Sequence, residues 1–165
     1  MRDEWAEDVA TNRWPWSGSV AGRVKEGLEC KSPVGGVELV RTFFKFSAID
    51  WAWKMHDHDL TPLLEDPKSR WSHPALLTLT GRMYGSDTNV VPTDPVDLYL
   101  NGVPWWISLT KGHYKYIRTL VEGEIEELYD LNADPEELRN LALEQEFQKK
   151  LARYRKATIA ELRRR

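Results

Sequence analysis

Two histidines and two aspartates alternate at His56, Asp57, His58 and Asp59, within the run MHDHDL. Histidine and carboxylate side chains are common zinc ligands, and a His-x-His pair on a strand would place both imidazoles on one face. Two ligands do not close a site, and no other cluster of histidine, cysteine or aspartate has ligand spacing. The run is either half of a metal site or a polar connector with exposed histidines, and we expect the connector.

The composition bounds the class of protein. The chain has 165 residues, 41% hydrophobic and 30% charged, which is typical of one soluble domain or a fragment of a larger one. A net charge of -3 does not favour a nucleic-acid partner, and no apolar run reaches the ~20 residues that a membrane helix needs. The start MRDEWAEDVATNRW is acidic and has no apolar core, so we do not expect it to be a signal peptide. Location is therefore unknown, with the cytoplasm as the default.

The single cysteine, Cys30, excludes an internal disulfide framework and is weakly typical of a reducing compartment. Eight tryptophans are present, three of them at positions 5, 14 and 16. Residues 1–34 lack a clean periodicity, so we expect an irregular, tryptophan-rich arm.

The elements that must position any site begin at residue 36. Apolar residues at helical spacing predict an amphipathic helix, namely Val37, Val40, Phe43, Phe44 and Ala48. Asp59 or Thr61 caps a short turn with Pro62 at its start, and Asp66-Pro67 marks another turn. HPALLTLTG at residues 73–81 is typical of a buried strand, and a long loop follows at 82–103.

Three β-rich runs at residues 103–110, 113–121 and 125–131 are joined by short glycine-bearing turns, which predicts an antiparallel meander. In NADPEELRNLA, Asp134, Pro135 and Glu137 form a predicted helix start. A last helix carries one apolar face made of Phe147, Leu151, Tyr154, Thr158 and Leu162. The fold class is therefore α+β: a small meander with a packed C-terminal helix, an N-terminal helix and the arm.

The segment VPWWISLTKGHYKYIRTLVEGEIEELYDLNADPEELRNLA, residues 103–142, resembles the C-terminal region of the sulfatase family in the alkaline-phosphatase superfamily. Members commonly carry a Tyr-Lys-Tyr-Ile strand, a Glu-Leu-Tyr-Asp-Leu strand and the motif Asp-Pro-Glu-Glu-x-x-Asn-Leu-Ala. These stand here at residues 114–117, 127–131 and 134–142. Residues 37–71 also look like the family. The resemblance covers residues 35–165, whereas residues 1–34 match nothing.

The resemblance implies hydrolysis of a sulfate ester, or of a related phosphoester. It also implies a calcium ion and a formylglycine nucleophile made from the cysteine of a Cys-x-Pro-x-Arg motif. Cys30 stands in CKSPVGG, where Ser32 and Val34 occupy the proline and arginine positions, and no apolar strand ends in Asp-Asp. We therefore expect Cys30 to be structural or incidental, with no catalytic residue, metal ligand or cofactor in this chain.

The resemblance implies that the hairpin carrying Lys111 and His113 lies near the substrate. Arg82, Tyr84 and Asp87, in the loop GRMYGSDT, are further candidates for residues near the substrate. For each residue, ordinary turn chemistry is the alternative.

Three hypotheses follow. The first is the C-terminal part of a sulfatase, inactive as this chain, whose partner is the missing N-terminal catalytic region and whose full enzyme acts on a sulfate ester. The second is a non-enzymatic module that docks a separate catalytic chain or another partner. The third is a small metal-binding protein built on His56 and His58.

Overall fold

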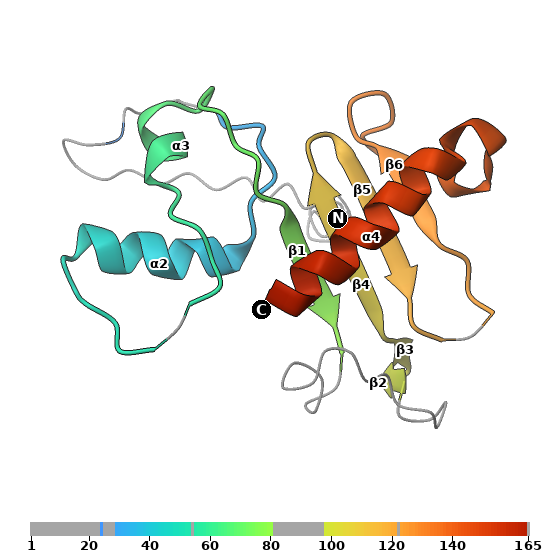
Figure 1. Ribbon diagram of the computed structural model, residues 1–165, viewed down its shortest axis with the longest axis horizontal. Helices are drawn as coiled ribbons and strands as arrows, with labels where there is room; N and C mark the ends of the chain where they lie inside the picture. Colours follow the sequence, from blue (N-terminus) through green and yellow to red (C-terminus); the bar gives the residue numbers. More distant parts are fainter. Residues whose placement is uncertain (1–23, 25–28, 54, 81–97, 122, 165) are drawn as a thin grey trace, which may run out of the picture. The chain divides into compact units, whose positions relative to one another are not determined.

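The structure is a computed structural model that describes residues 24, 29–53, 55–80, 98–121 and 123–164. It consists of two compact units, Met1–His73 and Pro74–Arg165 (Figure 1). Most of the tryptophan-rich arm and the greater part of the loop predicted at 82–103 lie outside the described residues.

The first unit contains α2, Gly36–Phe46, and the short α3, Thr61–Glu65. The predicted helix is confirmed, and its start depends on Gly35, whose N–H donates to the Glu38 carboxylate at 2.7 Å. A Cβ on residue 35 would lie 2.8 Å from that carboxylate oxygen, so the close approach requires glycine. The short turn predicted around Pro62 is the helix α3, which has Pro62 near its N-terminus. Before it, the Asp59 carboxylate accepts the Thr61 N–H at 2.9 Å.

The second unit is built on a four-stranded antiparallel sheet in the order β1-β4-β5-β6. The strands are β1 Ala75–Leu79, β4 Trp106–Lys111, β5 Tyr114–Thr119 and β6 Glu127–Asp130, and α4, Gln148–Arg164, crosses one face (Figure 1). The predicted buried strand, the meander and the packed C-terminal helix are therefore confirmed.

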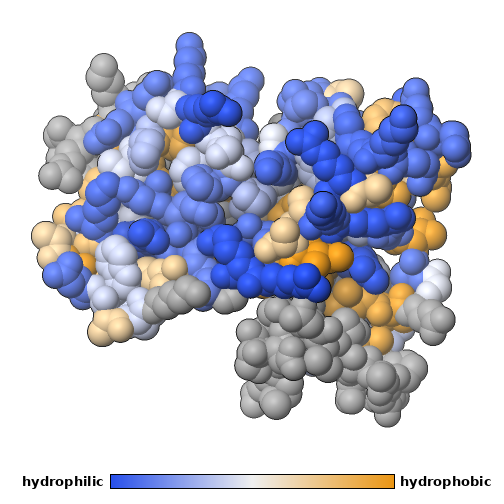
Figure 2. Space-filling view, viewed as in Figure 1, coloured by the Kyte–Doolittle hydropathy of each residue, from blue (hydrophilic) through white to orange (hydrophobic). Residues whose placement is uncertain are grey.

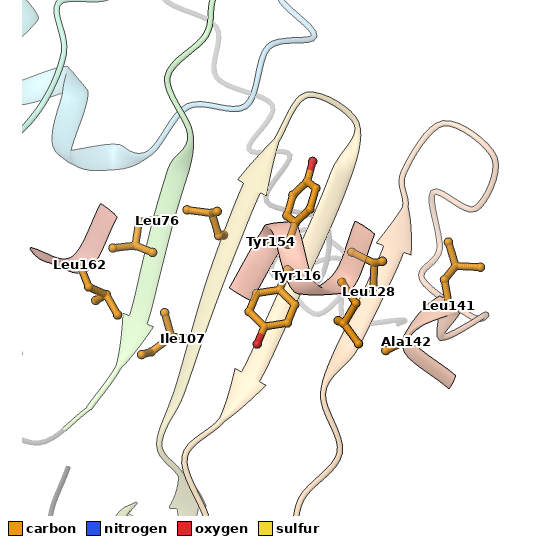
Figure 3. Close-up of a cluster of buried hydrophobic side chains, with 10 residues drawn as sticks. Leu76, Ile107, Tyr116, Leu128, Leu141, Ala142, Tyr154 and Leu162 are labelled. Carbon is orange, nitrogen blue, oxygen red and sulfur yellow. The ribbon is translucent and has the colours of Figure 1, made fainter. Parts of the chain in front are cut away.

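The core of this unit lies between α4 and the sheet. Leu109 pairs with Tyr116 across β4 and β5, and Tyr116 pairs with Leu128 across β5 and β6, which places all three fully buried side chains on one face. Figure 3 shows α4 crossing over these strands with Tyr154 and Leu162 directed to the core. The other core residues are Leu76, Ile107, Leu141, Ala142 and Leu151.

A short hairpin replaces the end of the predicted long loop. Strands β2, Tyr99–Leu100, and β3, Val103–Pro104, pair through Asn101 and Gly102, whose φ values are 53° and 81°. Positive φ at both central residues is the type I′ geometry that an Asn-Gly pair favours. The loop prediction is wrong at residues 99–103, because Asn101-Gly102 forms the tight turn of a hairpin there.

The predicted helix start at Asp134 is also wrong, because α4 begins only at Gln148. The Asp134 carboxylate does accept the N–H groups of Leu138 and Arg139, at 3.1 and 2.8 Å. Glu137 has a left-handed φ of 57°, which no helix tolerates, and its carboxylate binds Lys115 at 2.7 Å. The glutamate that would complete the capping box binds a buried lysine instead, and two short 3₁₀ turns, η2 Leu141–Leu143 and η3 Gln145–Phe147, precede α4.

Candidate functional site

The β4–β5 hairpin brings Lys111 and His113 together, as the sequence predicted. Lys111 pairs with Tyr114, and Gly112 has a φ of 62°, as the first central residue of a type II′ turn requires. Both Lys111 and His113 are exposed. Their approach to a substrate stays a prediction, and Arg82, Tyr84 and Asp87 lie outside the described residues.

Aromatic and charged groups surround this hairpin. The Lys150 ammonium on α4 lies 3.4 Å from the centre of the Tyr114 ring, and the His113 and Tyr114 rings are 4.4 Å apart. His113 Nε2 lies 3.8 Å from the carboxylate of Asp130. The end of the sheet therefore presents the ammonium groups of Lys111 and Lys150 and the His113 imidazole beside an aromatic ring, which is suited to holding an anionic group.

Hydrogen bonds fix the geometry of this end of the sheet. The Tyr154 hydroxyl donates to the Lys111 carbonyl at 2.7 Å, and burial raises the pKa of Tyr154 to about 12, so it remains a donor at neutral pH. Burial would raise the pKa of Asp130, but hydrogen bonds from Tyr114 and from the N–H groups of Asn132 and Ala133 outweigh it and lower that pKa. Asp130 is therefore ionised at neutral pH, and it partly balances the cations.

A second cluster was missed by sequence reasoning. The Glu126 carboxylate accepts from the Arg155 guanidinium, with Nε–oxygen distances of 2.9 and 2.6 Å, and from the Tyr116 hydroxyl. Burial alone would raise the pKa of Glu126, but these bonds lower it, whereas burial and Glu126 together raise the pKa of Tyr116. The cluster ties α4 to the sheet. Arg155 is 29 positions from Glu126, so no local sequence pattern could have revealed it.

The alternating run MHDHDL lies along the polar side of α2. The Asp57 carboxylate accepts the Arg41 N–H at 3.1 Å, and the Asp59 carboxylate pairs with the Lys45 ammonium. Burial would raise the pKa of Asp59, but the hydrogen bonds from Lys45 and Thr61 lower it. This part of the run is therefore a connector that binds α2, as expected.

The histidines of the run are half-buried rather than exposed, which corrects that part of the expectation. The His58 ring stacks on His73 with centroids 3.7 Å apart and meets Trp71 edge-on. An imidazole that is covered by other rings is poorly placed to bind a metal. Within the described residues, no three histidine, cysteine, aspartate or glutamate side chains are grouped so as to hold a metal ion.

Thr42 joins the connector to α2, and its replacement gives a first testable prediction. Its hydroxyl accepts the Leu60 N–H at 3.0 Å and donates to the Glu38 carbonyl at 2.8 Å, and the residue is 1% exposed. Thr42→Val leaves the Leu60 N–H buried without its acceptor, so we expect the first unit to lose about 1–3 kcal/mol of unfolding free energy. Thr42→Ser, which keeps the hydroxyl, should lose less in urea denaturation. Equal losses for the two variants would contradict this role of the hydroxyl.

Comparison with known proteins locates this fold. No family model matches the chain, and no curated protein matches it either. Among solved structures, BT1596, described as a 2-O GAG sulfatase, is 25% identical over 76% of this chain, with a TM-score of 0.57. BT4656, solved in complex with its substrate D-glucosamine-2-N,6-O-disulfate, is 19% identical over 85% of this chain, with a TM-score of 0.63.

The chain has the fold of a sulfatase C-terminal subdomain. Phosphonate monoester hydrolase from Silicibacter pomeroyi, of the same superfamily, shares this fold at 15% identity over 86% of the chain, with a TM-score of 0.58. The chain spans only about a quarter of the length of these proteins, namely 24%, 26% and 27% of BT1596, BT4656 and the phosphonate hydrolase.

The residues of this sulfatase-like chain do not fit the calcium ion or the formylglycine that the family implies. Cys30 is exposed, its sulfur lies 3.8 Å from the Pro67 carbonyl, and Ser32 and Val34 replace the motif's proline and arginine. The described residues also offer no group of oxygen ligands of the kind that calcium requires. None of the described helices is long and apolar enough to cross a membrane.

Proposed function

We propose that this chain is the C-terminal subdomain of a sulfuric ester hydrolase. The observation that carries the proposal is its likeness to BT1596 at 25% identity and a TM-score of 0.57, over 76% of this chain but 24% of that enzyme. In this proposal the nucleophile and the metal belong to a catalytic region beyond this chain, and the chain alone is inactive.

The β4–β5 hairpin is the part of this subdomain that contributes to the substrate site. Lys111 and Lys150 place positive charge at this end of the sheet, where the His113 ring lies beside the Tyr114 ring. A sulfate group is a permanent anion that accepts charge-assisted hydrogen bonds from such groups. The hairpin therefore binds and orients the sulfated group, while the chemical step takes place elsewhere.

The proposal predicts a clear result in an activity assay. The DNA upstream of Met1 should encode a Cys-x-Pro-x-Arg motif and a strand ending in Asp-Asp. The combined polypeptide, made together with the formylglycine-generating enzyme, should hydrolyse 4-nitrophenyl sulfate, whereas residues 1–165 should not.

A substitution tests the hairpin in the restored enzyme. Lys111→Ala should raise KM for a sulfated glucosamine by about tenfold with kcat little changed. Lys149→Ala, at an exposed lysine on α4, serves as the matched control.

Two results would contradict this proposal. One is formylglycine at Cys30, detected by mass spectrometry of the peptide, together with activity of residues 1–165 alone. The other is a restored enzyme that cleaves a phosphonate monoester but no sulfate ester, which would move the chain to the related hydrolases that share its fold.

A further inference from the structure

Lys150, in the first turn of α4, is held by aromatic rings rather than by a carboxylate. Its ammonium lies 3.4 Å from the centre of the Tyr114 ring and 5.5 Å from the centre of the Phe147 ring. Among the described residues no carboxylate forms an ion pair with it, whereas Arg155 on the same helix pairs with Glu126. A ring face attracts a cation without neutralising it, and an ammonium has three N–H donors. Lys150 therefore keeps charge and donors for an anionic ligand.

Lys111 is the second ammonium beside the same ring. It pairs directly with Tyr114 across β4 and β5, so the two side chains lie on one face of the sheet. Tyr116, two residues further along β5, lies on that face too and packs in the core with residues of α4. Two different elements, the β4–β5 hairpin and α4, thus place Lys111 and Lys150 beside the Tyr114 ring.

The backbone that carries Lys111 is held from both sides of the hairpin. The Tyr154 hydroxyl, which points toward the hairpin in Figure 3, donates to the Lys111 carbonyl at 2.7 Å. On the other side, the Leu131 N–H donates to the His113 carbonyl, also at 2.7 Å. A site whose parts are held in place loses less freedom on binding, which favours a ligand whose anionic groups match the arrangement of its charges.

Asp130, the acidic side chain at this end of the sheet, is used by other groups. Its carboxylate accepts a hydrogen bond from Tyr114 and lies 3.8 Å from His113 Nε2. Within the described part of the chain it forms no ion pair with Lys111 or Lys150. The visible face in Figure 2 is mostly hydrophilic, and Lys111 is exposed, so a ligand reaches the two ammonium groups from solvent.

We propose that Lys111 and Lys150 bind two sulfate groups of one substrate, so that the enzyme prefers saccharides with two neighbouring sulfates over those with one. This inference rests on the proposed function, and it names the class of substrate. Lys111 orients the sulfated group that reacts, and Lys150 binds a second sulfate that stays on the sugar. A sulfate ester carries a single negative charge, so a substrate with one sulfate leaves the second ammonium without an anionic partner. An unpaired charged group of this kind lowers the affinity for the substrate that lacks its partner.

The test uses the restored enzyme, encoded by residues 1–165 and the sequence upstream of Met1, with sucrose octasulfate as the probe. This sugar carries a sulfate on every hydroxyl, so it presents neighbouring pairs at every position of its rings. We expect it to inhibit hydrolysis of 4-nitrophenyl sulfate, which carries one sulfate. Lys150→Gln should raise the inhibition constant by about tenfold. The same variant should change KM and kcat for 4-nitrophenyl sulfate by less than about twofold.

Lys149→Gln is the matched control, because it removes the same charge from the neighbouring exposed position of α4. It should leave the inhibition constant unchanged. Lys150→Arg keeps the charge and the contact with the rings, so it should retain most of the inhibition. Circular dichroism shows whether each variant is folded. Lys150→Met, which keeps the aliphatic stem against the rings, makes the same test if Lys150→Gln is unfolded.

Separate results overturn the inference and the proposed function. A restored enzyme that hydrolyses no sulfate ester overturns both. A sulfatase whose inhibition weakens equally in Lys150→Gln and Lys149→Gln, or in neither, overturns the role of Lys150 alone. If Lys150→Gln raises KM for 4-nitrophenyl sulfate as much as it raises the inhibition constant, Lys150 only supports the hairpin, and the preference for two sulfates is wrong.

Discussion

Lys115→Met is expected to lower the unfolding free energy of the second unit by about 3–5 kcal/mol. The Lys115 ammonium lies 3.0 and 2.7 Å from the two carboxylate oxygens of Glu137, and the two side chains are only 7% and 10% exposed. Removal of the lysine leaves a carboxylate in a site that water barely reaches. The cost of such an uncompensated charge exceeds the net value of the pair itself. Urea denaturation monitored by tryptophan fluorescence measures the loss.

The loss should depend on pH in a defined direction. Burial raises the pKa of Glu137 even though Lys115 opposes that rise. Removal of the Lys115 ammonium therefore raises the pKa of Glu137 further. The folded variant then holds a proton that the unfolded chain has released, at every pH between the ordinary and the raised pKa. Its stability therefore falls as the pH rises through that window, and the variant should be less destabilised at pH 5 than at pH 8.

A double substitution separates the effect of the unpaired charge from the effect of lost side-chain packing. Lys115→Met combined with Glu137→Gln removes both charges and should be more stable at pH 8 than Lys115→Met alone. A loss below about 1 kcal/mol for Lys115→Met, with no dependence on pH, would mean that the pair behaves as an exposed surface ion pair.

Asn140→Ala is expected to cost about 2–3 kcal/mol, because one side chain makes three hydrogen bonds. Its Oδ1 accepts the N–H groups of Leu128 and Ala142, both at 3.0 Å, and its Nδ2 donates to the Glu126 carbonyl at 3.0 Å. β6 is an edge strand of the sheet. The Asn140 amide therefore binds the outer edge of β6, as a further strand would. Leu128 is fully buried, so its N–H would lose the Asn140 acceptor without access to water.

Asn132→Ala is the control for this prediction, because Asn132 is exposed and only its backbone N–H binds Asp130. It should change stability by no more than about 0.5 kcal/mol. Amide hydrogen exchange gives a local readout, in which the Leu128 N–H should exchange faster in Asn140→Ala. Unchanged protection of that N–H would show that the side chain does not hold the edge of β6.

Periodicity predicted the elements well where a single face packs against one partner. The β-rich runs of residues 103–131 predicted the meander, and the apolar spacing of 147–162 predicted the face of α4 on which Leu151, Tyr154 and Leu162 lie, which packs in the core. These signals are local, because strand and helix geometry alone decide which residues share a face. The hairpin at Lys111 and His113 followed from its glycine for the same reason.

The residues themselves determined the four strands of the main sheet, the two longer helices, the hairpin that presents Lys111 and His113, and the likeness to sulfatases. Only the tertiary structure decided which side of α2 is buried, because the aspartates of MHDHDL satisfy its polar side from residues 57–59 of the connector. The tertiary structure also has no helix at the start predicted from Asp134, where Glu137 has a left-handed φ and binds Lys115. Contacts between side chains distant in sequence decide these features, because the free-energy cost of burying an unpaired charge exceeds the free energy of helix propensity.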